Sequence, residues 1–205
     1  MGKGLSIPNP QPLNTMPTIL VTGGGRGIGR AIALAFADAG STVAVAARTR
    51  AEVEATAAEI RKRGAEAIPL TVDVTDEQSV AAGIGRLRET ARRLDVVVNN
   101  AGVGGGQPVE SADPRSWRRV LDTNVWGTFL VTRQALPLMN DGGRIVNMSS
   151  VLGRFGVEKS IGRSYYDALN ISYRQSLHRH VSTVSNYTYG KALAFEGNPA
   201  AFRNS

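Results

Sequence analysis

The chain has 205 residues, of which 42% are hydrophobic and 20% charged, a balance typical of a globular domain and not of a disordered chain. It has no Cys and only two His, so disulfides and thiolate metal sites are excluded and we expect no metal centre. The net charge of +7 would suit nucleic acid, but the cations form short runs at the ends of predicted helices, where they complement the helix dipole. No apolar run approaches the roughly 18 residues of a membrane span, so we expect neither nucleic acid nor a membrane as partner.

Composition divides the chain into three parts. Residues 1–15 hold three Pro and no apolar stretch like that of a signal peptide, so we predict a flexible tail and a cytoplasmic location. Residues 16–157 carry every Val/Ile-rich run that we assign as a strand. Residues 158–205 contain all five Tyr and both His of the chain, and there we assign no strand and expect lower order than in the rest.

Five short Val/Ile-rich runs alternate with longer amphipathic stretches from residue 19 onward. Strands separated by helices of ten or more residues are typical of βαβ units in a parallel sheet. We therefore predict an α/β, doubly wound, Rossmann-like sheet with strand order 3-2-1-4-5, in a single domain that is incomplete at its C-terminal end. The predicted strands are 19–21, 42–47, 67–72, 95–98 and 144–148, and the predicted helices are 30–39, 50–63, 77–93 and 113–139.

A glycine-rich turn, TGGGRGIG over residues 22–29, directly follows the first predicted strand and precedes the first helix. Positions without a side chain let backbone N–H groups approach a pyrophosphate, and the helix N-terminus adds the positive end of its dipole. The order of strand, glycine turn and helix therefore predicts a dinucleotide site that involves Gly23, Gly27 and Gly29, in preference to an ordinary turn.

The ends of the second and third strands carry candidate contacts to the adenosine part of the dinucleotide. In such a fold an acidic residue at the end of the second strand binds the ribose 2′-hydroxyl, whereas Arg accepts a 2′-phosphate. This chain has Arg48 there and Arg26 in the glycine turn, so we predict NADP(H) over NAD(H); the alternative for Arg48 is a solvated cation at a strand end. Asp73 precedes Val74 at the end of the third strand, and its carboxylate would either accept from the adenine amine or serve as a turn or helix N-cap residue.

Five motifs in this order resemble the short-chain dehydrogenase/reductase family over about residues 16–157, and its 3-oxoacyl-acyl-carrier-protein reductases in particular. They are the glycine turn, Asp73-Val74, the NNAG stretch of residues 99–102, Asn124 in NVWG, and Ser149-Ser150. The resemblance implies an NADP(H)-dependent oxidoreductase that passes hydride between the nicotinamide and a carbonyl or hydroxyl substrate, such as a 3-oxoacyl thioester, free or bound to an acyl carrier. It also implies a homo-oligomer.

The resemblance assigns roles to particular residues as well. Asn124 would hold a proton-relay water, and Ser150 would hydrogen-bond the substrate carbonyl oxygen. The implied cofactor-binding residues are Gly23, Arg26, Gly27, Ile28, Gly29, Arg48, Asp73, Val74, Asn100, Ala101 and Gly102.

The family also places a Tyr roughly a dozen residues after the Ser, with a Lys four positions later that lowers the pKa of the phenol. Tyr165 and Tyr166 fall in this window, but neither has a Lys four positions on. The chain's Tyr-x-x-x-Lys pair is Tyr187 and Lys191, which we take as the candidate catalytic pair. Two functions therefore stay open: an active reductase, or a catalytically impaired nucleotide-binding module or truncated product of such a reductase.

Overall fold

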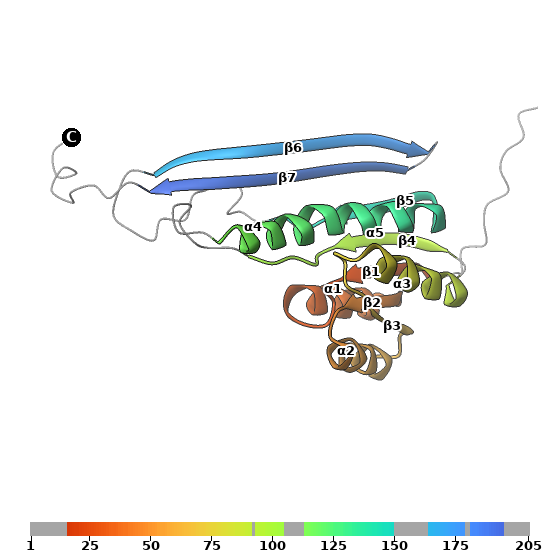
Figure 1. Ribbon diagram of the computed structural model, residues 1–205. Coiled ribbons are helices and arrows are strands. Elements are labelled where there is room, and N and C mark those ends of the chain that lie inside the picture. Colours follow the sequence, from red (N-terminus) through yellow and green to blue (C-terminus); the bar gives the residue numbers. More distant parts are fainter. Residues whose placement is uncertain (1–15, 92, 105–112, 150–163, 179–180, 195–205) are drawn as a thin grey trace, which may run out of the picture.

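Five parallel strands form the central sheet of the computed structural model, and helices separate them along the chain (Figure 1). The structure describes residues 16–91, 93–104, 113–149, 164–178 and 181–194, the last two ranges as backbone. The strands are β1 (Thr18–Thr22), β2 (Thr42–Ala47), β3 (Ala67–Thr71), β4 (Leu94–Asn99) and β5 (Met139–Asn147). The helices are α1 (Gly27–Asp38), α2 (Arg50–Lys62), α3 (Glu77–Thr90), α4 (Pro114–Leu121) and α5 (Gly127–Ala135). The sheet order β3-β2-β1-β4-β5 confirms the predicted doubly wound fold.

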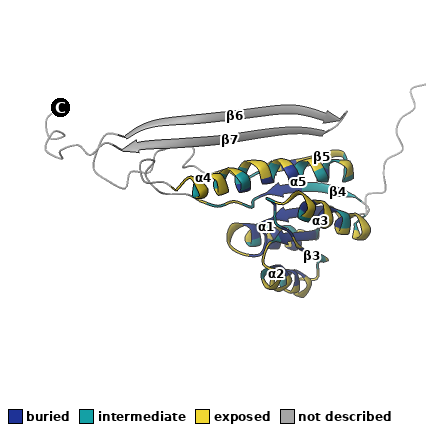
Figure 2. Ribbon diagram, in the orientation of Figure 1, coloured by how far each residue is buried: buried dark blue, intermediate teal, exposed yellow. Residues whose placement is uncertain are grey.

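Both faces of the sheet are covered, which explains why its central strands read as continuous apolar runs. Every residue of β1 is buried, and side chains alternate between the two faces along the strand. Ile19 and Val21 pack with the apolar faces of α1 and α2, whereas Leu20 packs with those of α3 and α5. Figure 2 shows the result as dark blue central strands beneath helices whose outer sides are yellow.

The parallel arrangement brings the segments after β1, β2, β3 and β4 to one edge of the sheet, because parallel strands all end on the same side. β1 pairs with β2 in register from Thr18–Thr42 to Thr22–Ala46, and with β4 from Ile19–Val96 to Val21–Val98. Ligands of open α/β sheets bind at this carboxyl edge, where the order of the strands reverses. Here the reversal falls between β1 and β4.

The helical stretch before β5 contains a wider turn that the sequence does not reveal. It runs from α4 through the π-helical turn η2 (Asp122–Trp126) into α5, and a 3-10 turn, η3 (Leu136–Leu138), leads directly into β5. The predicted helix over 113–139 is thus right in extent, but the fifth strand begins at Met139 and not at Arg144. π-helical turns occur preferentially at functional sites.

Two long strands lie in the region where we assigned none, so that prediction is wrong. β6 (Ser164–His178) and β7 (Val181–Ala194) pair in antiparallel fashion as a separate sheet. In Figure 1 they form their own layer, with β7 alongside β5. They contain all five Tyr of the chain, a residue that favours strands without producing the Val/Ile runs on which the assignments depended.

Candidate cofactor-binding site

The glycine turn folds back tightly between β1 and α1. Gly23 and Gly27 adopt positive φ angles of 65° and 55°, a conformation that side chains disfavour. Gly29 is the third residue of α1, and a Cβ there would overlap the carbonyl oxygen of Gly23 and the side-chain amide of Asn100. Nothing lies within 4 Å of the Cβ position of Gly27. The turn is therefore closely packed on its inner side and open at Gly27.

Thr22, the last residue of β1, ties the turn to the end of β4. Its buried hydroxyl accepts from the backbone N–H groups of Asn100 and Ala101, both at 3.0 Å, and donates to the carbonyl of Val98 at 3.3 Å. The side-chain amide of Asn100 donates in return to the Thr22 carbonyl at 3.0 Å. Asn100 thus joins the ends of β1 and β4. The hydrogen bonds of the Thr22 hydroxyl were not predicted, because they depend on a partner 78 residues away.

The other side of the turn is held by β2 and α2. The N–H of Gly24 donates to the carbonyl of Ala46 at 3.1 Å. Thr56 is fully buried in α2, and its hydroxyl donates to the carbonyl of Gly25 at 3.2 Å. Sequence reasoning gave Thr56 no role, because a lone Thr on a helix carries no signal of its partner.

The first helical turn of α1 is exposed to solvent on the side where the glycine turn is open. Arg26 is the N-cap residue and makes no side-chain capping hydrogen bond, and the first turn contains no acidic residue. The next two residues, Gly27 and Ile28, are exposed as well, and Ile28 is 67% exposed in spite of its apolar side chain. A pyrophosphate binds where free backbone N–H groups, the positive end of a helix dipole and a glycine without a side chain come together. These residues therefore fit a dinucleotide.

The two predicted phosphate ligands, Arg26 and Arg48, border this opening from different strand ends. Arg48 directly follows β2 and is exposed. Arg26 is also exposed, and its Nε lies 3.9 Å from Oε1 of Glu52 in the first turn of α2. Both guanidinium groups can therefore be reached from solvent.

Asp73 forms a turn after β3. Its Oδ1 accepts from the backbone N–H and the hydroxyl of Thr75, at 2.9 and 2.8 Å, while Asp76 caps α3. The observed role is thus the turn alternative, and Oδ2 makes no hydrogen bond within the described part of the chain. Val74 is buried against Gly127 at the start of α5, where a Cβ would approach the Val74 side chain at 2.8 Å.

Asn124 lies in the π-helical turn and faces the segment after β4. Its Oδ1 accepts from the N–H of Val103 at 2.9 Å, and its Nδ2 donates to the Val103 carbonyl at 3.0 Å. Its backbone carbonyl accepts from the hydroxyl of Thr128 at 2.9 Å. Gly102 lies beside its Oδ1. The structure therefore brings Asn124 to the same strand end as Asn100–Gly102, where it fixes the loop; the relay water stays a prediction.

The other predicted catalytic residues stay predictions. Ser150 lies outside the described residues. Tyr187 and Lys191 both lie in β7, paired with Ile171 and Asp167 of β6. At roughly 3.3 Å per residue, four residues along an extended strand separate their Cα atoms by about 13 Å, whereas one helical turn would separate them by about 6 Å.

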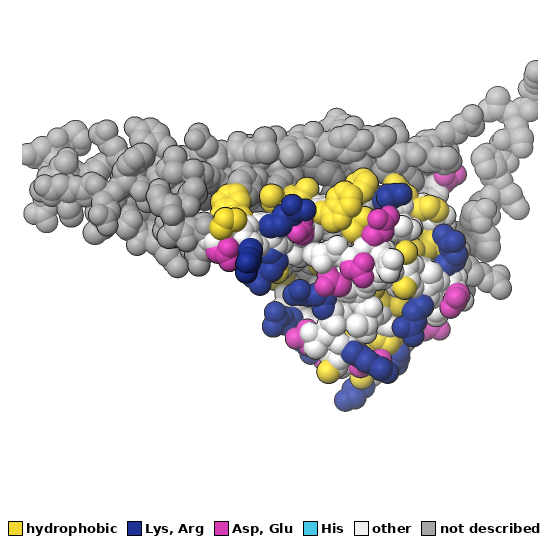
Figure 3. Space-filling model, viewed as in Figure 1, with side chains coloured by type: hydrophobic (Ala, Val, Ile, Leu, Met, Phe, Trp, Pro, Cys, Tyr) yellow, Lys and Arg dark blue, Asp and Glu magenta, His cyan; other side chains and the backbone are white. Residues whose placement is uncertain are grey.

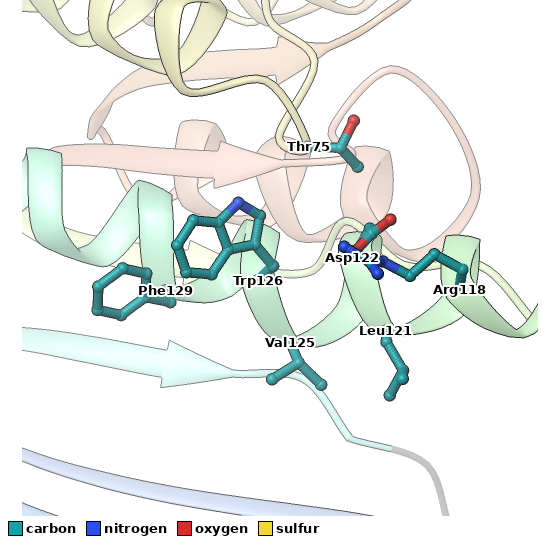
Figure 4. Close-up of a pocket in the computed structure, with 7 residues that line it drawn as sticks. All are labelled: Thr75, Arg118, Leu121, Asp122, Val125, Trp126 and Phe129. Carbon is teal, nitrogen blue, oxygen red and sulfur yellow. The ribbon is translucent and has the colours of Figure 1, made fainter.

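An apolar groove follows the exposed side of the helix around η2, with Thr75 also in its lining. We call it the α4–α5 groove. It has a volume of about 830 Å³ and is lined by Thr75, Arg118, Leu121, Asp122, Val125, Trp126 and Phe129. In Figure 4, Trp126 and Phe129 lie side by side with ring centroids 5.1 Å apart, and Leu121 and Val125 point to the side of the helix away from Thr75. In Figure 3 these apolar side chains gather along α4 and α5, whereas charges of both signs mix over the helices below.

Comparisons with known proteins agree with this geometry. The short chain dehydrogenase family model matches residues 17–168, so the chain belongs to that family. The chain is 40% identical over 141 residues to 2-(S)-hydroxypropyl-CoM dehydrogenase 3 of Xanthobacter autotrophicus, which covers 68% of this chain and 55% of that protein. It is 37% identical over 102 residues to a probable NADP-dependent dehydrogenase of Haemophilus influenzae, which covers 48% of this chain and 40% of the relative.

Among solved structures, a 3-ketoacyl-ACP reductase from Sinorhizobium meliloti superposes with a TM-score of 0.65 and 42% identity, over 67% of this chain and 55% of that one. The chain spans between 30% and 60% of the length of the curated relatives that it matches. No helix within the described residues has both the length and the apolar character needed to cross a bilayer.

Proposed function

We propose that the chain binds NADP(H) at the carboxyl edge of its sheet. The observation that carries the proposal is the glycine turn, closed on its inner side by Gly29 and open at Gly27, next to an uncapped helix start. The backbone N–H groups of this turn would hold the pyrophosphate, and the exposed Ile28 side chain would pack on the dinucleotide. Asn100, Ala101 and Gly102 lie across from the turn, where small side chains leave room for the nicotinamide half.

The 2′-phosphate of the adenosine would lie between Arg26 and Arg48. Guanidinium groups offer the bidentate donors that phosphate prefers, and the residue directly after β2 is Arg48 and not an acid that would select a 2′-hydroxyl. The free oxygen of Asp73 would accept from the adenine amine. One relative carries the description of a probable NADP-dependent dehydrogenase, which supports this choice.

The proposed reaction is hydride transfer between the nicotinamide and a carbonyl or hydroxyl substrate, such as a 3-oxoacyl thioester or a similar ketone. The bound nicotinamide would supply the hydride chemistry. The chain's own part is positioning and proton transfer: Asn124 fixes the loop after β4, and Ser150 would hydrogen-bond the substrate oxygen. Proton donation to that oxygen by a phenol contributes roughly 10²–10⁴-fold to the rate of such reactions.

A nucleotide-binding module without turnover is the second candidate, and one observation favours it. Tyr187 and Lys191 lie on an extended strand, about 13 Å apart at Cα. One turn of helix would bring the two Cα atoms to about 6 Å, which is the spacing of the Tyr-x-x-x-Lys pattern that the family resemblance implies.

Two assays on the full chain separate these candidates. The binding of NADPH and of NADH is titrated with wild type and with Arg48→Ala. Loss of one charge-assisted contact costs about 1.5–3 kcal/mol. The affinity for NADPH should therefore fall about tenfold or more, and the affinity for NADH should change little. If both nucleotides weaken equally, Arg48 does not hold the 2′-phosphate.

NADPH oxidation with 3-oxoacyl thioesters and activated ketones then tests catalysis. We expect binding with little or no turnover. Robust turnover that disappears in Tyr187→Phe would assign the phenol to Tyr187, whereas turnover that survives this change and disappears in Tyr165→Phe or Tyr166→Phe would assign it to one of those residues.

We further propose that the chain forms a homo-oligomer through the exposed face of α4 and α5. Leu121, Val125, Trp126 and Phe129 are 38% to 48% exposed there, which is unusual for contiguous large apolar side chains. The neighbouring Arg118 and Asp122 carry opposite charges, so two copies of this face related by a twofold axis can pair apolar with apolar and cation with anion.

A further inference from the structure

The first turn of α2 is packed directly on the glycine turn. A Cβ on Gly25 would lie 2.8 Å from the Cβ of Glu52, so the absence of a side chain at Gly25 is what lets α2 approach. One helical turn later, the buried Thr56 hydroxyl holds the carbonyl of Gly25 at 3.2 Å. The backbone of Glu52 is therefore fixed against the turn and cannot move away from it without breaking this contact.

Glu52 places a negative charge beside one of the two Arg residues proposed to hold the 2′-phosphate. Its Oε1 lies 3.9 Å from the Nε of Arg26, and the two side chains are 35% and 83% exposed. Arg48 has no carboxylate within ion-pair distance among the described residues. The two cations are thus unequal: Arg26 already has an anionic partner, and Arg48 does not.

We infer that Glu52 tunes the choice between the two nicotinamide dinucleotides by competing with the 2′-phosphate for Arg26. This inference rests on the proposed NADP(H) site. A phosphate that approaches Arg26 must displace the Glu52 carboxylate or accept its repulsion, whereas the 2′-hydroxyl of NAD(H) brings no charge and meets no such competition. Glu52 therefore weakens the binding of NADP(H) but not that of NAD(H). It reduces the preference for NADP(H) over NAD(H) that Arg48 provides.

The test compares Glu52→Gln with Glu54→Gln. Glu54 lies two residues further along α2 on its exposed side, so the control removes the same charge from the same helix without touching the turn. Dissociation constants for NADPH and NADH are measured by fluorescence titration at low and at high salt. An exposed pair of this kind contributes up to about 1 kcal/mol, which corresponds to roughly fivefold in affinity.

We expect Glu52→Gln to bind NADPH about two- to fivefold more tightly than wild type, with NADH unchanged. The gain should shrink at high salt, because screening weakens an exposed charge pair. Glu54→Gln should change neither constant.

Three results would overturn the inference. Weaker NADPH binding in Glu52→Gln would show that the carboxylate orients Arg26 for the phosphate. An unchanged ratio of the two constants would show that Glu52 has no part in the choice, while the proposed site would stand because wild type still binds NADPH. Wild type that binds neither nucleotide would overturn the proposed site itself.

Discussion

The two halves of the sheet differ in how completely they are packed. In the half made of β1, β2, α1 and α2, all of β1 and most of β2 are buried, and hydrogen bonds from Thr22 and Thr56 join the loop after β1 to its neighbours. In the half made of β5, α4 and α5, only Gly143 and Ile145 of β5 are buried, and α4 has no buried residue.

Exposed apolar side chains follow the same division. Most of the large ones lie in the second half; these are Leu121, Val125, Trp126, Phe129, Val146 and Met148. The first half is the more completely packed and holds the glycine turn, Arg26 and Arg48, whereas the other proposed cofactor contacts follow β3 and β4. The second half presents the apolar surface proposed above as the contact between copies. Binding of the pyrophosphate and the 2′-phosphate should therefore depend on the first half.

Filling the glycine turn is the change expected to have the largest effect. A methyl group in Gly29→Ala would overlap the backbone of Gly23 and the amide of Asn100, and backbone can give way only at a high cost. Overpacking costs typically about 1–3 kcal/mol, and we expect the upper end of that range together with loss of NADPH binding. Urea unfolding and nucleotide titration measure the two effects.

Gly85→Ala is the matched control for this variant. Gly85 lies inside α3 with nothing within 4 Å of its Cβ position, so alanine there should stabilise the chain by about 0.5–1 kcal/mol. If both glycine variants changed stability alike, the close packing of the turn would not be what requires glycine at residue 29.

Removing the apolar side chains of the second half should change assembly more than stability. The double variant Trp126→Ser/Phe129→Ser removes a stacked pair that is about half exposed, so unfolding should become easier by only about 1 kcal/mol. Size-exclusion chromatography with light scattering should show fewer oligomers than for wild type. Ile28→Ser, at the exposed start of α1, should leave the oligomeric state unchanged. If both variants lost oligomers to the same extent, the face of α4 and α5 would not be the contact between copies of the chain.

The smallest effect concerns a charge network on the surface of the first half. Glu59 in α2 pairs with Arg63 of the same helix and with Arg30 of α1, and Arg63 also pairs with Asp38. Hydrogen bonding to Arg63, with the nearby charge of Arg30, holds the pKa of the Glu59 carboxyl below its ordinary value of 4.5.

A carboxyl whose pKa is lower in the folded chain contributes stability above its unfolded pKa, and this contribution is lost as the pH falls through the folded pKa. Glu59→Gln should therefore lower the melting temperature slightly at neutral pH, and the difference from wild type should vanish once the pH falls below the lowered pKa of Glu59. A difference that persisted in acid would have to come from packing and not from this charge.

The sequence predicted the first half well because its signals are local. Strand 42–47 matches β2 residue for residue, and the glycine turn, Arg26 and Arg48 lie where the βαβ pattern places them. Hydrophobic runs and glycine spacing depend on neighbours in the chain, so a sequence alone can show them. The hydroxyl of Thr22 accepts hydrogen bonds from the backbone of Asn100 and Ala101, and no sequence pattern near Thr22 reveals those partners.

The second half was predicted less well for the same reason. The π-helical turn at Asn124 is one extra residue within a continuous helix, and its amphipathic pattern hardly changes there. β5 begins five residues before the Val/Ile run that marked it, with the sequence MNDGG, which reads as a turn. In β6, Leu169, Ile171 and Tyr173 alternate with polar residues, but this short stretch lacks the Val/Ile runs on which the strand assignments depended.

The most direct test of the proposed site is an amide NMR titration of the full chain with NADPH. Binding at the carboxyl edge should shift the resonances of Gly23 to Gly29, Arg48 and Asn100 to Gly102, and leave those of Arg118 to Leu121 and of Phe129 unchanged. NADH should shift the glycine turn in the same way but Arg48 much less. Shifts concentrated in the α4–α5 groove, or no shift at Gly23 to Gly29 at saturating NADPH, would contradict a cofactor site at the carboxyl edge of the sheet.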